Sequence, residues 1–143
     1  MLRAARLSGL ALAALLAWLA PPDVRACQCA QARPELAPSL AGAAAVVRAR
    51  VRSHAFVTGE GFHTELVVEE VFKGTPGRVL ALDAAKTCAF GFEPGGRYLV
   101  FAYADGDAGF TTTYCTRTAP LGDATADVAW LRKHASARVV PRP

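Results

Sequence analysis

Two of the four cysteines stand at positions 27 and 29, separated by one residue, directly behind an apolar N-terminal stretch. An even number of cysteines in an exported chain predicts disulfide bonds. A Cys27–Cys29 bond would close a very short, strained ring. The two remaining pairings both join this pair of residues to Cys88 and Cys115, and such long loops are worth about 4 kcal/mol each in the chain-entropy model. The sequence thus predicts a chain start that is held at two points, although chain ends ordinarily fray.

The first 26 residues have the pattern of a secretory signal peptide. Arg3 and Arg6 precede an apolar run over 7–20, which at 14 residues is too short to span a bilayer. Residues 24–26 suit cleavage after Ala26, which would make Cys27 the first residue of a mature chain that is secreted or periplasmic. Lipoprotein processing at the same cysteine is the nearest alternative, but the residue before Ala26 is an arginine, where lipoprotein signals have a small apolar residue.

The rest of the chain is long enough for one domain with a single core. We expect that domain to cover residues 27–134 and to be followed by a flexible tail at 135–143. Without the signal peptide the chain has 13 basic and 11 acidic residues, a net charge of +2. This small surplus argues against nucleic acid as a partner, and no membrane span is expected in the mature form.

Alternating apolar and polar residues predict a mainly β fold. Arg48, Arg50 and Arg52 alternate with apolar residues in the first strand, and Glu65 and Glu69 of the second are expected to pair with them across the strands. A helix is expected at 124–134, with a side-chain cap from the preceding aspartate. The expected strands cover 44–57, 62–72, 78–83, 97–104 and 110–115. Five short strands joined by glycine turns indicate a small closed barrel with a C-terminal helix.

Several short segments, in this order, resemble the N-terminal domain of the tissue inhibitors of metalloproteinases and, more widely, the netrin-like module. The segments are Cys27-Gln28-Cys29, residues 45–51, Val71-Phe72-Lys73-Gly74, Thr87-Cys88, residues 95–101 and Tyr114-Cys115. Together they span most of residues 27–134. The resemblance implies a five-stranded barrel of the OB type, stapled at its N-terminus by disulfides Cys27–Cys88 and Cys29–Cys115.

The resemblance also implies a function. In these inhibitors the N-terminal cysteine binds the catalytic zinc of the target protease through its α-amino nitrogen and its carbonyl oxygen. The matching residue is Cys27, and the side chain of Gln28 would enter the pocket beside that zinc. The expected partner is therefore a zinc metalloproteinase, and the chain itself would need no cofactor.

Two departures from the family support an alternative. The inhibitors usually have a small hydroxyl residue where Gln28 stands, and their N-terminal domain has a third disulfide that this chain lacks. Many netrin-like modules do not inhibit proteases. The alternative is therefore a secreted or periplasmic protein-interaction module whose disulfides are purely structural.

Other functional classes have weaker support in the sequence. His54, His63 and His134 lack the spacing of a metal site, so no intrinsic metal is expected. There is no Gly-x-Ser-x-Gly motif, and the chain is predicted not to be an enzyme. A thiol or copper(I) function of the Cys-x-Cys pair would need free thiols, and two further cysteines are available to form bridges instead.

Overall fold

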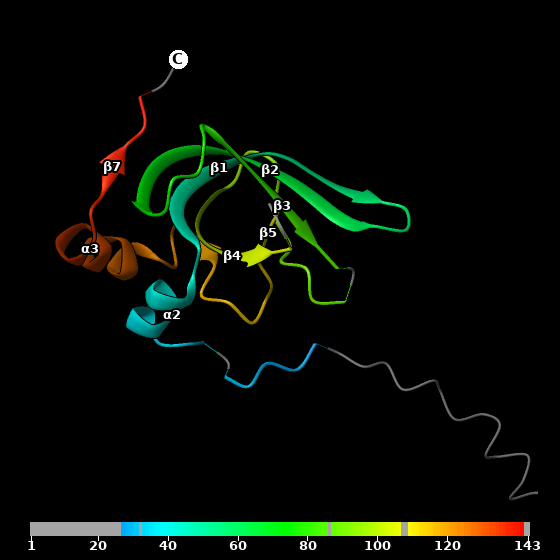
Figure 1. The fold of residues 1–143 in the computed structure, drawn as a ribbon, viewed down its shortest axis with the longest axis horizontal. Helices are drawn as coiled ribbons and strands as arrows, with labels where there is room; N and C mark the ends of the chain where they lie inside the picture. The colour runs from blue at the N-terminus through cyan, green and yellow to red at the C-terminus, as the bar shows by residue number, and fades with distance from the viewer. Residues whose placement is uncertain (1–26, 32, 86, 107–108, 142–143) are drawn as a thin grey trace, which may run out of the picture.

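A computed structural model describes residues 27–31, 33–85, 87–106 and 109–141 (Figure 1). The predicted signal peptide, residues 1–26, lies outside the described residues. The elements, in chain order, are α2 (Leu36–Gly42), β1 (Ala45–Val57), β2 (Gly61–Lys73), β3 (Val79–Ala84), β4 (Arg97–Asp105), β5 (Gly109–Thr111), β6 (Ala119–Pro120), α3 (Thr125–His134) and β7 (Arg138–Val139).

The five larger strands form one coiled antiparallel sheet in the order β3-β2-β1-β4-β5. The edge strands β3 and β5 contact each other, so the sheet is nearly closed into a barrel, with α2 and α3 together on one side (Figure 1). Three register shifts along the β1–β2 ladder are irregularities of the kind that sharpen the bend of a strand. The predicted fold class, a small five-stranded barrel of the OB type with a C-terminal helix and a disulfide-stapled N-terminus, is confirmed.

The alternation in β1 divides the hydrophobic side chains between two cores. Ala45, Val47, Ala49 and Val51 face the barrel interior. Val46 points to the outer face, where α2 and α3 cover it. The inner core also includes Leu66, Val68, Leu80, Leu82, Tyr98 and Val100. The outer core includes Phe72, Leu99, Phe101, Ala124, Val128 and Leu131, with Leu36 and Leu40 packed against it.

Lys73 and Gly74, at the end of β2, contact the end of helix α2 and the residues that follow it. The Lys73 ammonium donates hydrogen bonds of 2.8 Å to the carbonyl oxygens of Leu40 and Ala41 at the end of that helix. Gly74 has a φ of +80°, and a Cβ atom at this position would lie 2.5 Å from the carbonyl oxygen of Ala44. Only glycine fits this turn without strain.

The structure differs from the sequence-based expectations at three segments. The last large strand was expected at 110–115, but β5 is limited to Gly109–Thr111 and the residues after it form a loop. Residues 135–143 were expected to be a mobile tail, yet Arg138–Val139 forms β7 against β2. Helix α3 begins after Ala124 without a side-chain cap, so the expected capping by Asp123 is wrong.

Candidate functional site

Two disulfide bonds hold the segment at 27–31 against two different loops. Cys27 is bonded to Cys88 and Cys29 to Cys115, with Cα–Cα distances of 5.4 and 5.1 Å. This is the pairing that the family resemblance implies. The side chain between the two bridges, Gln28, is exposed. The residues at 27–31 are therefore held by two covalent bonds at one end of the barrel, and we call this segment the N-terminal edge.

The two bridges lie next to each other. The Sγ atoms of Cys27 and Cys115, which belong to different bridges, are 3.7 Å apart. The sulfur atoms of Cys27, Cys29 and Cys115 all lie within 4.8 Å of one another. All four cysteines are in disulfides, so in this oxidised state the cluster offers no thiolate to a metal ion.

A buried threonine network positions the loop that carries Cys115. The Thr112 hydroxyl donates to the carbonyl oxygen of Phe101 at 2.9 Å and lies 2.8 Å from the hydroxyls of Thr116 and Thr118. Thr118 Oγ1 also accepts a 3.0 Å hydrogen bond from the Phe101 amide. These bonds satisfy buried polar groups that would otherwise destabilise the fold, and they fasten the loop to β4.

The loop that carries Cys88 is bonded to the loop that carries Cys115. Ala89 forms a single antiparallel bridge with Thr113, and the Tyr114 amide donates a 3.2 Å hydrogen bond to the Cys88 carbonyl oxygen. The Phe90 ring packs on the Tyr114 ring at a centroid distance of 5.3 Å. Tyr114 is 57% exposed, so an aromatic side chain is displayed beside the disulfides.

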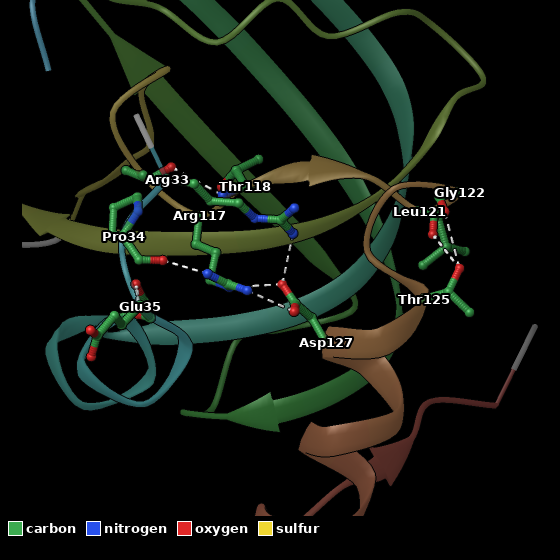
Figure 2. A network of polar contacts seen from close by, with 11 residues as sticks. Arg33, Pro34, Glu35, Arg117, Thr118, Leu121, Gly122, Thr125 and Asp127 are labelled. Carbon is green, nitrogen blue, oxygen red and sulfur yellow. Dashed lines mark hydrogen bonds and ion pairs between the residues drawn. The ribbon is translucent and has the colours of Figure 1, made fainter. Parts of the chain in front are cut away.

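A group of ionic contacts anchors the chain just after the N-terminal edge (Figure 2). The Arg117 guanidinium donates to both carboxylate oxygens of Asp127, at 2.7 and 2.8 Å, and also to the carbonyl oxygen of Pro34. Arg33 donates to the same carboxylate at 3.1 Å. The Asp127 side chain is only 8% exposed. Residues 33 and 34 are thereby tied to helix α3.

Burial raises the pKa of Asp127, but its hydrogen bond from Arg117 and the charges of Arg117 and Arg33 outweigh that effect. The net result is a pKa below the ordinary value for an aspartate. The carboxylate is thus ionised at neutral pH and keeps both arginines in place. No local sequence pattern indicates this group, because Arg33 is distant in sequence from Arg117 and Asp127.

In the part of the chain that the structure describes, the three histidines do not come together in a metal site. His54 Nδ1 lies 2.8 Å from the hydroxyl of Thr64, and the His54 ring stacks on Phe62. His63 Nδ1 lies 2.7 Å from a carboxylate oxygen of Asp83, and His134 bonds the backbone within α3. Among the described residues, only the disulfide sulfurs form a group of three potential ligands.

The two disulfides indicate an oxidising environment, as found outside the cell. Within the described ranges, no helix has both the length and the apolar character that a membrane crossing needs. The sequence matches no protein-family model and no curated protein.

Proposed function

We propose that this chain is an exported protein that inhibits a zinc metalloproteinase through its mature N-terminus. After cleavage behind Ala26, the α-amino nitrogen and carbonyl oxygen of Cys27 would bind the catalytic zinc of the protease. One observation carries the proposal: Cys27 and Cys29 are bonded to two separate loops, and the residue between them is exposed. Such an edge enters a protease cleft with little loss of conformational freedom.

The chemistry of a chain terminus suits this task. A catalytic zinc keeps one coordination position open for water or substrate. A terminal α-amine has a pKa of about 7.7–8.0, so a metal displaces its proton at modest cost near neutral pH. The carbonyl oxygen of the same residue completes a small chelate ring. The zinc belongs to the partner, and the inhibitor contributes only backbone atoms to it.

The residues around the terminus would supply the rest of the contact. The exposed side chain of Gln28 is next to the chelating atoms and would enter the pocket beside the zinc. Tyr114 precedes the half-cystine Cys115 and presents a mostly exposed ring on the neighbouring loop. Exposed aromatic side chains are common anchors of protein–protein interfaces, so we assign Tyr114 to the contact surface.

The decisive experiment compares two forms of the mature protein, one that begins at Cys27 and one with an additional alanine before it. Each is titrated against a panel of zinc metalloproteinases, with a serine protease as a control for non-specific inhibition. The first form should inhibit at least one zinc enzyme, and the extension should weaken inhibition at least about a hundredfold, since it displaces the amine from the metal. Equal inhibition by both forms would show that the terminus does not chelate zinc.

Mass spectrometry of the exported protein tests the premise of this mechanism. It should find a mature chain that begins with an unmodified Cys27. An acylated cysteine, as in a lipoprotein, or a longer N-terminus would remove the proposed chelating group.

One observation favours a second candidate, a secreted or periplasmic interaction module without inhibitory activity. Gln28 is larger than the small hydroxyl residue that the inhibitors usually have at this place. A Gln28→Ser variant separates the two candidates, because it should strengthen inhibition if the edge enters a protease pocket. If neither the parent protein nor this variant inhibits any zinc protease, the interaction module is the better account.

A further inference from the structure

The outer face of the sheet is covered over only part of its area. Helices α2 and α3 pack over Val46, Leu99 and Phe101. The next part of the same face, across β1, β2, β3 and β4, is covered by neither of these helices. It forms a groove with a volume of about 900 Å³, which we call the basic groove. The groove shares no residue with the N-terminal edge and its loops, so the inference below does not depend on the proposed function.

One half of the basic groove is made of arginines. Arg48, Arg50 and Arg52 project from alternate positions of β1, and Arg97 of β4 stands directly opposite Arg50 in the ladder. Among the residues that line the groove, the acidic member is Glu69, which lies 3.4 Å from Arg48 and 3.1 Å from Arg97. Arg48 also lies 3.3 Å from Glu70, and Arg52 lies 3.8 Å from Glu65. The positive charge of the groove that no carboxylate compensates therefore comes from its two remaining arginines.

Two arginines of the groove are left without partners among the described residues. The guanidinium groups of Arg50 and Arg78 make no hydrogen bond or ion pair with any residue that the structure describes, and both side chains are exposed. Like charges directly opposite each other on neighbouring strands destabilise a sheet. Arg50 and Arg97 are such a pair, and Glu69 compensates Arg97 but not Arg50. An anionic ligand would supply the counter-charge that Arg50 lacks.

The other half of the groove is mostly apolar and includes one arginine, Arg78. Val67 of β2 lies in register with Arg50 on one side and with Val79 of β3 on the other. Val79 is 44% exposed and Val139 of β7 is 73% exposed. Residues 139–141, which follow α3, form a wall of the groove. A ligand that fills it must therefore present anionic and apolar groups side by side.

We propose that the basic groove binds an extended segment of a partner protein that contains both acidic and apolar side chains. The row from Arg97 through Arg50 and Val67 to Val79 crosses four strands. At the usual strand spacing this row is about 14 Å long, which about four extended residues would span. Each guanidinium offers a planar pair of donors that matches a carboxylate.

A sulfated polysaccharide is a less suitable occupant, because it would leave the valines uncovered. It offers anions to the arginines but no apolar group to Val67, Val79 and Val139. The pairing of charge with apolar surface is therefore the observation that selects a peptide over a purely polyanionic ligand.

The test uses NMR titration of the mature, disulfide-bonded protein with three blocked hexapeptides. The first has three glutamates followed by three valines, so that each face of the extended chain carries both kinds of side chain in the order of the row from Arg97 to Val79. The second replaces glutamate by glutamine, and the third replaces valine by serine. The first should shift the amide signals of Arg50, Val67 and Val79, and each replacement should weaken binding about tenfold or more. Higher salt should weaken the first peptide's binding as well.

Two single variants assign the effect to the groove. Arg50→Gln removes an exposed cation that has no partner among the described residues, and it should weaken the glutamate–valine peptide about tenfold without changing the fold. Lys133→Gln, which removes an exposed cation from α3 outside the groove, should leave binding unchanged. Equal losses in both variants would mean that binding follows net charge alone, and this would overturn the proposal.

Three further outcomes would also overturn the proposal. They are the absence of shifts at millimolar glutamate–valine peptide, equal affinity for the glutamine peptide, and binding of a sulfated heparin tetrasaccharide in the groove when the peptide does not bind. The last outcome would assign the groove to sulfated polysaccharides instead.

Discussion

The two disulfides should contribute nearly equal stability, although they close loops of different length. The bridges Cys27–Cys88 and Cys29–Cys115 have sequence separations of 61 and 86. If each closed its loop alone, the chain-entropy model would assign them about 4.3 and 4.6 kcal/mol. The two bridges start only two residues apart, however, and each therefore shortens the loop that the other closes.

The relevant loop is the one that a bridge closes when the other bridge is already formed. When either bridge is present in the unfolded chain, the other closes a loop made of the step from Cys27 to Cys29 and the stretch from Cys88 to Cys115, about 29 residues in total. A loop of that length is worth about 3.6 kcal/mol. Removal of either bridge should therefore lower the free energy of unfolding by about 3.6 kcal/mol, and removal of both by about 8 kcal/mol.

The measurement is equilibrium unfolding in urea, on the mature protein and on the paired alanine variants Cys27→Ala/Cys88→Ala and Cys29→Ala/Cys115→Ala. Gln28→Ala is the matched control, because it changes an exposed residue between the half-cystines and leaves both bridges intact. Its free energy of unfolding should stay within about 0.5 kcal/mol of the parent's. The two bridge variants should also have larger m-values, because a less cross-linked unfolded chain exposes more surface.

The result that would refute this reasoning is a clear difference between the two paired variants. If one of them lost over about 1.5 kcal/mol more than the other, contacts around that bridge in the folded state would outweigh loop entropy. A loss on removing both bridges that is smaller than the sum of the separate losses would contradict the shared-loop argument in another way.

Three further changes test the polar contacts and the turn that position the site. Asp127→Asn should lower the free energy of unfolding by about 3 kcal/mol, because it leaves the mostly buried Arg117 guanidinium without a carboxylate, and thermal unfolding should show this as a drop of about 10 °C. Glu70 is buried, and the hydrogen bond from Arg132 lowers its pKa against the opposing effect of burial. Glu70→Gln should therefore lower the free energy of unfolding in urea by about 2 kcal/mol. An unchanged free energy of unfolding would show that the ion pair adds no stability. The folded state lowers the pKa of both carboxyls, so their contribution to the free energy of unfolding is complete above about pH 4 and is lost as the pH falls through the lowered pKa values. Asp127→Asn should therefore reduce the loss of stability at acid pH. An unchanged loss would refute the assignment. Gly74→Ala should destabilise by about 2 kcal/mol, since its φ of +80° disfavours any side chain, and circular dichroism melting that shows no change would contradict the tight turn.

Most of the strands could be predicted because their signal is local. Alternation in β1 and β2 follows from a sheet with one face inside a barrel, and the predicted limits of these strands lie within one residue of those observed. The expected pairing of Glu65 and Glu69 with the arginines of β1 is confirmed for Arg48 and Arg52, at 3.4 and 3.8 Å, whereas Arg50 has no partner among the described residues. Adjacent antiparallel strands bring such residues together whatever the rest of the fold does.

The end of the barrel near the disulfides could not be predicted in the same way. The threonines after β5 have the composition of a strand, yet they bond to the Phe101 backbone and to one another instead of continuing the ladder. Arg33 and Asp127 are 94 residues apart in sequence, and nothing local relates them. The partners of such polar groups depend on which elements the tertiary structure brings together, and no local pattern in the sequence indicates them.

The amino-acid sequence by itself determined the first four large strands, the number of bridges and the cysteines that stand at the start of the expected mature chain, because periodicity and covalent spacing are properties of the chain alone. Only the tertiary structure decided that the two bridges lie side by side, that Gln28 and Tyr114 are exposed at the same end, and that part of the arginine-rich face stays uncovered. The physical reason is that burial depends on what packs against a residue, and helix α3 and the residues after it cover one part of the sheet while leaving the other open.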